Sequence, residues 1–147
     1  MVDLPPNFVI DSTLCVGTIY RLVVPELIST KIPHYFIVVA IDGLDNYLVL
    51  CTSKGESKET YFLRNNLEFS GLIYIKPDSE NGLTAKTYVN CNDNYCINKP
   101  TLINKLQKGL LTHVGNISLN HYLQIKVGII NSYTNDLPHD LLVHSEE

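Results

Sequence analysis

The sequence predicts an α+β fold, mainly β, in which a small barrel or strongly bent antiparallel sheet is followed by two or three helices. Short β-rich runs alternate with turn-forming residues before Pro100, and helical spacing of apolar residues begins only after it. Many short strands at close spacing are typical of small barrels, because closure hides the strand edges. At 147 residues, we expect a single domain over 1–147, with a β part at about 15–99 and a helical part at about 100–143.

Seven β-rich runs are predicted as strands, at 17–25, 35–41, 47–53, 60–63, 72–76, 86–91 and 95–98. Their separators are rich in residues that accept turn geometry, for example Asp42-Gly43-Leu44-Asp45-Asn46 and Asn92-Asp93-Asn94. The run 36–41 is apolar throughout, which indicates a strand buried on both faces.

Two helices and a short helical turn are predicted after the strands. Pro100 suits the first turn of a helix that runs to about Lys108, with Gly109 as its terminator. A second helix begins behind Ser118, a favourable N-cap, with apolar residues spaced by three and four at Leu119, Tyr122, Ile125 and Ile129. Residues 138–142 form a further short turn of helix. We expect these helices to close one side or end of the barrel.

Composition and charge limit the classes of function. A hydrophobic content of 45% and a charged content of 18% are those of an ordinary globular protein. There is no run of about 18 apolar residues, so no membrane span or membrane partner is expected, and the first residues lack the pattern of a signal peptide, which predicts a cytoplasmic protein. The formal charge of −4 argues against a binder that holds nucleic acid by bulk electrostatics. Contacts with phosphate must therefore be either local or brief, as in an enzyme that needs only modest affinity.

The four cysteines are expected to be reduced thiols. Cys15 and Cys51 lie among apolar residues and behave as small hydrophobic side chains. Cys91 and Cys96 are compatible either with half a zinc site or with a hairpin that carries two incidental thiols. Because no second Cys/His pair has comparable spacing, the hairpin is favoured, and neither a metal nor a cofactor is expected.

Candidate functional residues lie at the mouth of two predicted neighbouring strands, where side chains are held rigidly but remain open to solvent. His34 precedes the apolar strand, and Thr52 and Ser53 end the next one. A histidine can transfer protons near neutral pH, and hydroxyls can donate hydrogen bonds to phosphate oxygens. The alternative is that His34 is a hydrogen-bonded structural residue and that Thr52 and Ser53 only form a turn.

Four short motifs resemble the PemK/MazF-like family of toxin ribonucleases. Gly17-Thr-Ile-Tyr-Arg-Leu is similar to the family's opening strand, and 33–40 to the strand that follows its Arg-Pro pair. Leu50-Cys-Thr-Ser53 is similar to the strand that ends in Thr-Ser, and Gly115-Asn-Ile-Ser118 to the family's closing element. The resemblance implies an SH3-like barrel, a homodimer with an RNA groove at the interface of its two barrels, and a small antitoxin protein as inhibitor.

The resemblance also implies a reaction that needs no metal. A base removes the proton of a ribose 2′-hydroxyl, the oxygen attacks the adjacent phosphorus, and an acid protonates the departing 5′-oxygen. His34 would exchange these protons, with Thr52 and Ser53 as hydrogen-bond donors. The family's arginine beside the proline is absent here, so Lys31 or Lys54 would have to supply its charge, without the bidentate geometry of arginine.

Two further residues are candidates for substrate contact. Arg64 could reach phosphate, although an exposed loop arginine is usually only solvated. Tyr35, one of nine tyrosines, could stack on a base, although most strand tyrosines are half-buried with the hydroxyl at the surface.

Two functions are therefore predicted. The first is a metal-independent endoribonuclease that cleaves single-stranded RNA as the toxin of a toxin–antitoxin system. The second is a non-catalytic SH3-like barrel that binds a protein or a nucleic acid, since the arginine on which the family's chemistry depends is missing.

Overall fold

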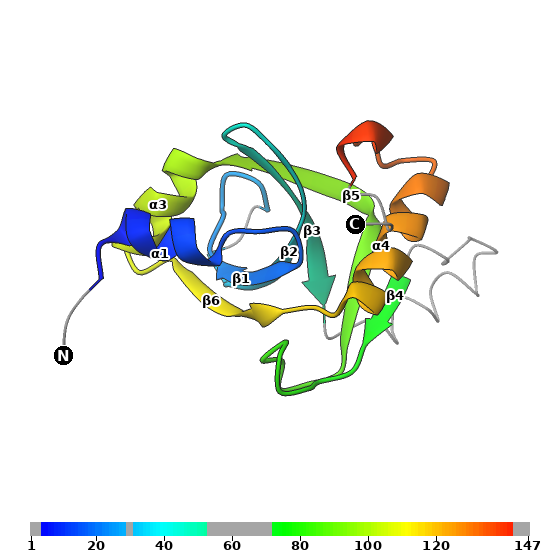
Figure 1. Cartoon of the computed structure of the whole chain (residues 1–147), viewed down its shortest axis with the longest axis horizontal. Helices are drawn as coiled ribbons and strands as arrows, with labels where there is room; N and C mark the ends of the chain where they lie inside the picture. The colour runs from blue at the N-terminus through cyan, green and yellow to red at the C-terminus, as the bar shows by residue number, and fades with distance from the viewer. Residues whose placement is uncertain (1–3, 29–30, 53–71, 143–147) are drawn as a thin grey trace.

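Six antiparallel strands form one sheet in the computed structural model, which describes residues 4–28, 31–52 and 72–142. The strands are β1 (Thr18–Leu22), β2 (His34–Asp42), β3 (Asp45–Thr52), β4 (Leu72–Ile75), β5 (Thr87–Asn98) and β6 (Leu111–Asn116). They pair in the order β4-β5-β3-β2-β1-β6, and the sheet bends strongly (Figure 1). The predicted α+β, mainly β, fold is confirmed. The predicted strand at 60–63 lies outside the described residues.

The described helices are α1 (Pro6–Thr13), α3 (Lys99–Gln107), α4 (Leu119–Asn131) and the short 3₁₀ helix η1 (His139–Leu141). The last three confirm the helices predicted from the sequence. At the start of α4, the Ser118 hydroxyl accepts a hydrogen bond of 3.2 Å from the backbone N–H of His121, as expected of an N-cap. None of the helices in these ranges has the length and apolar character needed to cross a membrane.

Both faces of the sheet are covered, because alternate residues of β2 belong to two different hydrophobic clusters. Phe36 and Val38 point to one face and pack in a cluster that includes Ile10 of α1 and Leu102 of α3. Ile37 and Val39 point to the other face, in a cluster that includes α4 residues Tyr122, Ile125 and Ile129. The expected burial of this strand on both faces is confirmed for residues 36–40, whereas Ile41 is 37% exposed.

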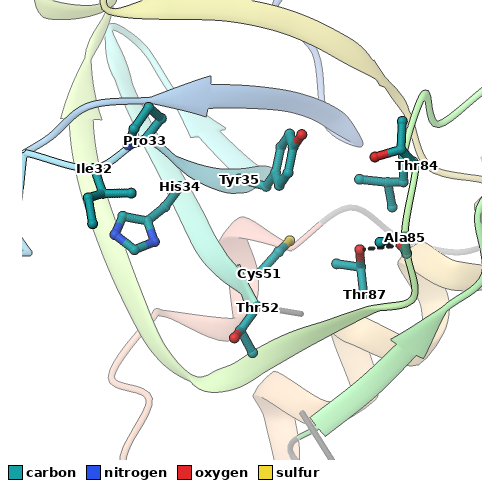
Figure 2. A pocket seen from close by; sticks show the side chains of 10 residues that line it. Ile32, Pro33, His34, Tyr35, Cys51, Thr52, Thr84, Ala85 and Thr87 are labelled. Atoms are coloured by element: carbon teal, nitrogen blue, oxygen red, sulfur yellow. Dashed lines mark hydrogen bonds between the residues drawn. The ribbon is translucent and has the colours of Figure 1, made fainter. Parts of the chain in front are cut away.

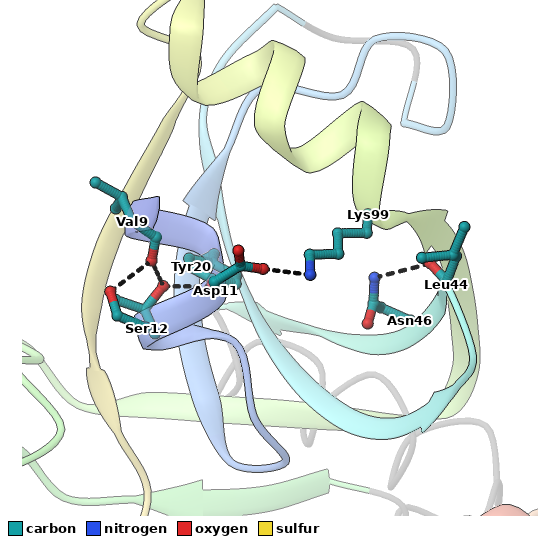
Figure 3. A network of polar contacts seen from close by, with 8 residues as sticks. Val9, Asp11, Ser12, Tyr20, Leu44, Asn46 and Lys99 are labelled. Carbon is teal, nitrogen blue, oxygen red and sulfur yellow. Dashed lines mark hydrogen bonds and ion pairs between the residues drawn. The ribbon is translucent and has the colours of Figure 1, made fainter. Parts of the chain in front are cut away.

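Two elements were not predicted. Helix α1 precedes the sheet, and an ion pair between Asp11 of α1 and Lys99 of α3 joins the two helices on the same face (Figure 3). Strand β6 lies inside the segment expected to be helical, between α3 and α4. It pairs with β1, from Thr18 opposite Asn116 to Leu22 opposite Leu111, and forms an edge of the sheet.

The hairpin predicted between Cys91 and Cys96 is wrong. Both residues belong to the continuous strand β5, which bulges where Leu48 of β3 faces Tyr95 and Leu50 faces Asn90. The polar residues expected to form a turn are held by the segment after α4 instead. Asn94 Nδ2 donates hydrogen bonds of 2.8 Å to the side chains of Asn135 and Asp136, Ser132 Oγ donates one to Asn92, and Thr134 Oγ1 donates one of 2.8 Å to the Asn92 carbonyl.

A turn in the connection between β4 and β5 packs against β6, at the far edge of the sheet. The backbone N–H of Asn116 donates a hydrogen bond of 3.0 Å to the Glu80 carbonyl. A Cβ atom at Gly82 would lie 2.2 Å from the Val114 carbonyl oxygen, and one at Gly115 would lie 2.5 Å from the backbone of Asn81. The two backbones therefore meet at glycines, and this contact links the β4–β5 side of the curled sheet to β6.

Candidate functional site

A pocket of ≈ 420 Å³ opens where β2 begins and β3 ends, facing the segment that leads into β5. Figure 2 shows the pocket with the side chains around it. The lining residues are Ile32, Pro33, His34, Tyr35, Cys51, Thr52, Leu83, Thr84, Ala85 and Thr87. Three of the site residues predicted from the sequence, His34, Tyr35 and Thr52, thus lie around one cavity.

The strand register explains why His34 and Thr52 come together. Tyr35 pairs with Cys51 in the antiparallel β2–β3 ladder, so one further step places His34 opposite Thr52. Directly opposed residues of antiparallel strands point to the same face of a sheet, with Cβ atoms about 4.5–5.5 Å apart. The side chain of Tyr35 points to the other face, toward Thr84, as Figure 2 shows.

The imidazole of His34 is placed differently from the expected open surface. Its Nε2 atom is buried and has no hydrogen-bond partner among the residues that the structure describes. An unpaired buried polar group costs about 1–3 kcal/mol. A ligand group that entered the pocket and paired with this nitrogen would remove that cost.

Arg21 is a candidate residue that the sequence analysis did not find. It lies in β1 directly opposite Tyr35 of β2, and its side chain is exposed. No ion pair or side-chain hydrogen bond links its guanidinium to any part of the chain that the structure describes. The β1–β2 register therefore places a cation next to Tyr35, on the face of the sheet opposite to that of His34 and Thr52. The arginine that the toxin family places beside its proline is absent here.

The other predicted site residues are not part of the pocket lining. Lys31 is exposed three positions before β2. Ser53, Lys54 and Arg64 lie outside the described residues. Within the described ranges, no group of three or more His, Cys, Asp or Glu side chains is arranged to hold a metal ion.

The cysteine in the pocket wall is chemically inert near neutral pH. Cys51 is 4% exposed, and burial together with the nearby Cys91 raises the pKa of its thiol. Burial also raises the pKa of the Cys91 thiol, to about 12. Because the thiolate is the nucleophilic form, Cys51 contributes an apolar wall and no nucleophile.

This difference between buried and exposed thiols predicts a labelling pattern. At neutral pH we expect DTNB to react with Cys15 and Cys96, which are exposed, and to leave Cys51 and Cys91 unmodified until the chain unfolds. Absorbance of the released thionitrobenzoate should correspond to two thiols per native chain and four in denaturant. Rapid reaction of three or four thiols in the native protein would contradict the burial of this pair.

The fold and the pocket together define an α+β protein with a bent antiparallel sheet and, at the strand ends, a mainly apolar pocket whose lining includes His34 and Thr52. A scan against protein-family models and a search of the curated proteins found no match to this chain.

Proposed function

We propose that this chain is a metal-independent endoribonuclease that cleaves single-stranded RNA at the pocket between β2 and β3. The observation that carries the proposal is the unpartnered Nε2 atom of His34 at a pocket where Thr52 lies opposite it in the strand register. Imidazole is the side chain best suited to proton transfer near neutral pH, and a hydroxyl beside it can donate a hydrogen bond to phosphate.

In this mechanism His34 exchanges a proton with the substrate at Nε2. It either accepts the proton of the ribose 2′-hydroxyl, while water protonates the departing 5′-oxygen, or protonates the 5′-oxygen, while water accepts the proton of the 2′-hydroxyl. The 2′-oxygen forms a bond to phosphorus as the bond to the 5′-oxygen breaks, which leaves a 2′,3′-cyclic phosphate. Thr52 Oγ1 donates a hydrogen bond to a non-bridging phosphate oxygen.

We assign the charge of the missing arginine to Arg21, which pairs with Tyr35 of the pocket lining. Negative charge increases on the phosphate oxygens during the reaction, and a preorganised cation stabilises it. Arg21 can contact two oxygens at once, which a lysine cannot. Because its side chain shares the face of Tyr35, Arg21 would reach the phosphate from the side of the pocket away from His34.

The resemblance to toxin ribonucleases supports the biological part of the proposal. The chain would act in the cytoplasm as a homodimer, and a small antitoxin protein would block it. Expression of the chain alone should then arrest growth, and co-expression of the protein encoded beside it should relieve the arrest.

The purified protein should cut single-stranded RNA in the presence of EDTA, because the nucleophile is the RNA's own 2′-hydroxyl. Mass spectrometry of the products should detect a cyclic phosphate. An RNA with 2′-O-methyl groups is the matched control and should remain intact. Cleavage that EDTA abolishes would overturn the metal-independent mechanism.

A second candidate is a non-catalytic barrel that binds nucleic acid or protein. The shielding of His34 Nε2 from solvent favours it, because a proton-transfer group must reach its substrate. Binding of single-stranded RNA with no cleavage of any RNA and no growth arrest would support this second function.

A further inference from the structure

A pair of tyrosines and a lysine lie together on β4 and at the start of β5, at the same end of the sheet as the pocket. Tyr74 of β4 lies opposite Tyr88 of β5, with ring centroids 5.5 Å apart. Lys86 Nζ lies 4.9 Å from the centroid of the Tyr74 ring and 5.7 Å from that of Tyr88. The three side chains form one cluster, which we call the Tyr74 cluster.

The strand register connects the Tyr74 cluster to His34. Tyr88 lies opposite Thr52 of β3, and one step beyond the β2–β3 ladder places Thr52 opposite His34. Tyr74, Tyr88, Thr52 and His34 therefore form a row across four adjacent strands. Neighbouring strands are about 4.8 Å apart, so the row spans about 14 Å.

The two tyrosines of the cluster differ in solvent exposure, and the more exposed one is accessible to a ligand. Tyr88 is 4% exposed and supports its neighbour, whereas Tyr74 is 41% exposed. A ring of this kind presents apolar area at low cost in conformational entropy. Tyr74 is therefore an anchored but accessible aromatic surface at the end of the row.

Basic side chains accompany the row, although the whole chain carries a formal charge of −4. Lys86 precedes β5, Lys76 follows β4, and Arg21 lies near the end of β1. These are all strand ends on the same side of the antiparallel sheet as the start of β2. Three basic residues therefore lie at the same end of the sheet as the pocket, without lining it, where local contacts with phosphate are needed.

We propose that the Tyr74 cluster is a subsite for single-stranded RNA, with one base stacked on Tyr74 and the adjacent phosphate bound by the ammonium group of Lys86. Sheets that bind single strands stack bases on surface aromatic side chains in this way. The choice of RNA as ligand rests on the proposed function. An RNA that follows the row from Tyr74 to Thr52 then reaches His34.

The test is binding of a fluorescein-labelled 2′-O-methyl RNA oligonucleotide, measured by fluorescence anisotropy, because this RNA cannot be cleaved. Tyr74→Ala should weaken binding about 5- to 150-fold, the range found when a stacking aromatic is removed. Tyr74→Phe, which retains the stacking ring, should bind within about twofold of the unmodified protein. Tyr133→Ala is the matched control, since Tyr133 is 98% exposed beyond the end of α4 and should have no effect.

Lys86 is tested through the salt dependence of the same binding. Lys86→Gln should weaken binding and lower the slope of log affinity against log salt by about 1, because one phosphate contact is lost. Lys99→Gln is the control, since Lys99 follows the opposite end of β5 and pairs with Asp11. It should leave the slope unchanged.

Circular dichroism and thermal unfolding are recorded for each variant, so that a loss of binding is not confused with a loss of the fold. Unchanged affinity of a folded Tyr74→Ala protein, or no binding by the unmodified protein, would overturn the subsite. Binding that depends on Tyr74 without cleavage of ordinary RNA would support the subsite and overturn the nuclease. Cleavage with an unaltered KM in Tyr74→Ala would overturn the subsite and leave the nuclease in place.

Discussion

Replacing His34 with alanine should lower the rate of RNA cleavage by about 10²–10⁴-fold, the usual contribution of one general acid or base. The fold should survive, because Nε2 makes no hydrogen bond to the described part of the chain and its removal eliminates an unpaired buried group. Single-turnover cleavage of a labelled RNA in EDTA measures the effect. Thr52→Ala should reduce the rate less, since a neutral hydroxyl is a weaker partner for phosphate than a charged group.

His121→Ala provides the matched control. The Nδ1 atom of His121 is also buried without a partner among the described residues, but it lies on α4, away from the β2–β3 pocket. A general effect of removing a buried imidazole would alter both variants equally. Equal cleavage by the unmodified protein and a folded His34→Ala variant would overturn the assigned proton transfer.

The sheet could be predicted from sequence wherever apolar strands have strong turn signals beside them. The segment around Gly43 is an example: Asp42 pairs with Asp45, and Gly43 has a φ of +62°, which glycine adopts at little steric cost. Helix α4 was predictable for the same reason, since Ser118 caps a segment with regular apolar spacing. In both cases the local sequence alone determines the conformation.

Elements that depend on distant partners were not predicted. In β6, only Leu111 and Gly115 are buried, and the strand gains its hydrogen bonds from β1. In α1, Ile10 is the only residue that is fully buried. The bulge of β5 depends on side chains beyond α4 that bind Asn92 and Asn94. None of these contacts leaves a periodic pattern in the sequence.

The candidate site was partly predictable. Strand ends indicated that His34 and Thr52 would meet, and the pocket contains both. Arg21 was missed because its importance depends on the residue opposite it across β1–β2, and Lys86 because its importance depends on the two tyrosine rings beside it. Arg21 could have been identified if the pairing of Tyr20-Arg21-Leu22 with the start of β2 had been predicted.

Gly82→Ala should destabilise the fold strongly, by about 2–5 kcal/mol. The positive φ of Gly82, +68°, contributes about 1–2 kcal/mol when a Cβ atom is present. Overpacking contributes about 1–3 kcal/mol more, because the new atom would lie 2.2 Å from the Val114 carbonyl oxygen of β6. Urea unfolding measures the change, which is a large fraction of the roughly 5–15 kcal/mol that stabilises a typical domain.

Gly43→Ala separates the two contributions. Gly43 has nearly the same φ, +62°, but a Cβ atom there would meet nothing within 4 Å, so only the backbone term of about 1–2 kcal/mol should remain. A larger loss of stability for Gly82→Ala than for Gly43→Ala thus measures the contact between the β4–β5 connection and β6. Equal losses would mean that the two backbones can move apart at no cost in stability. The contact between the β4–β5 connection and β6 would then not stabilise the sheet.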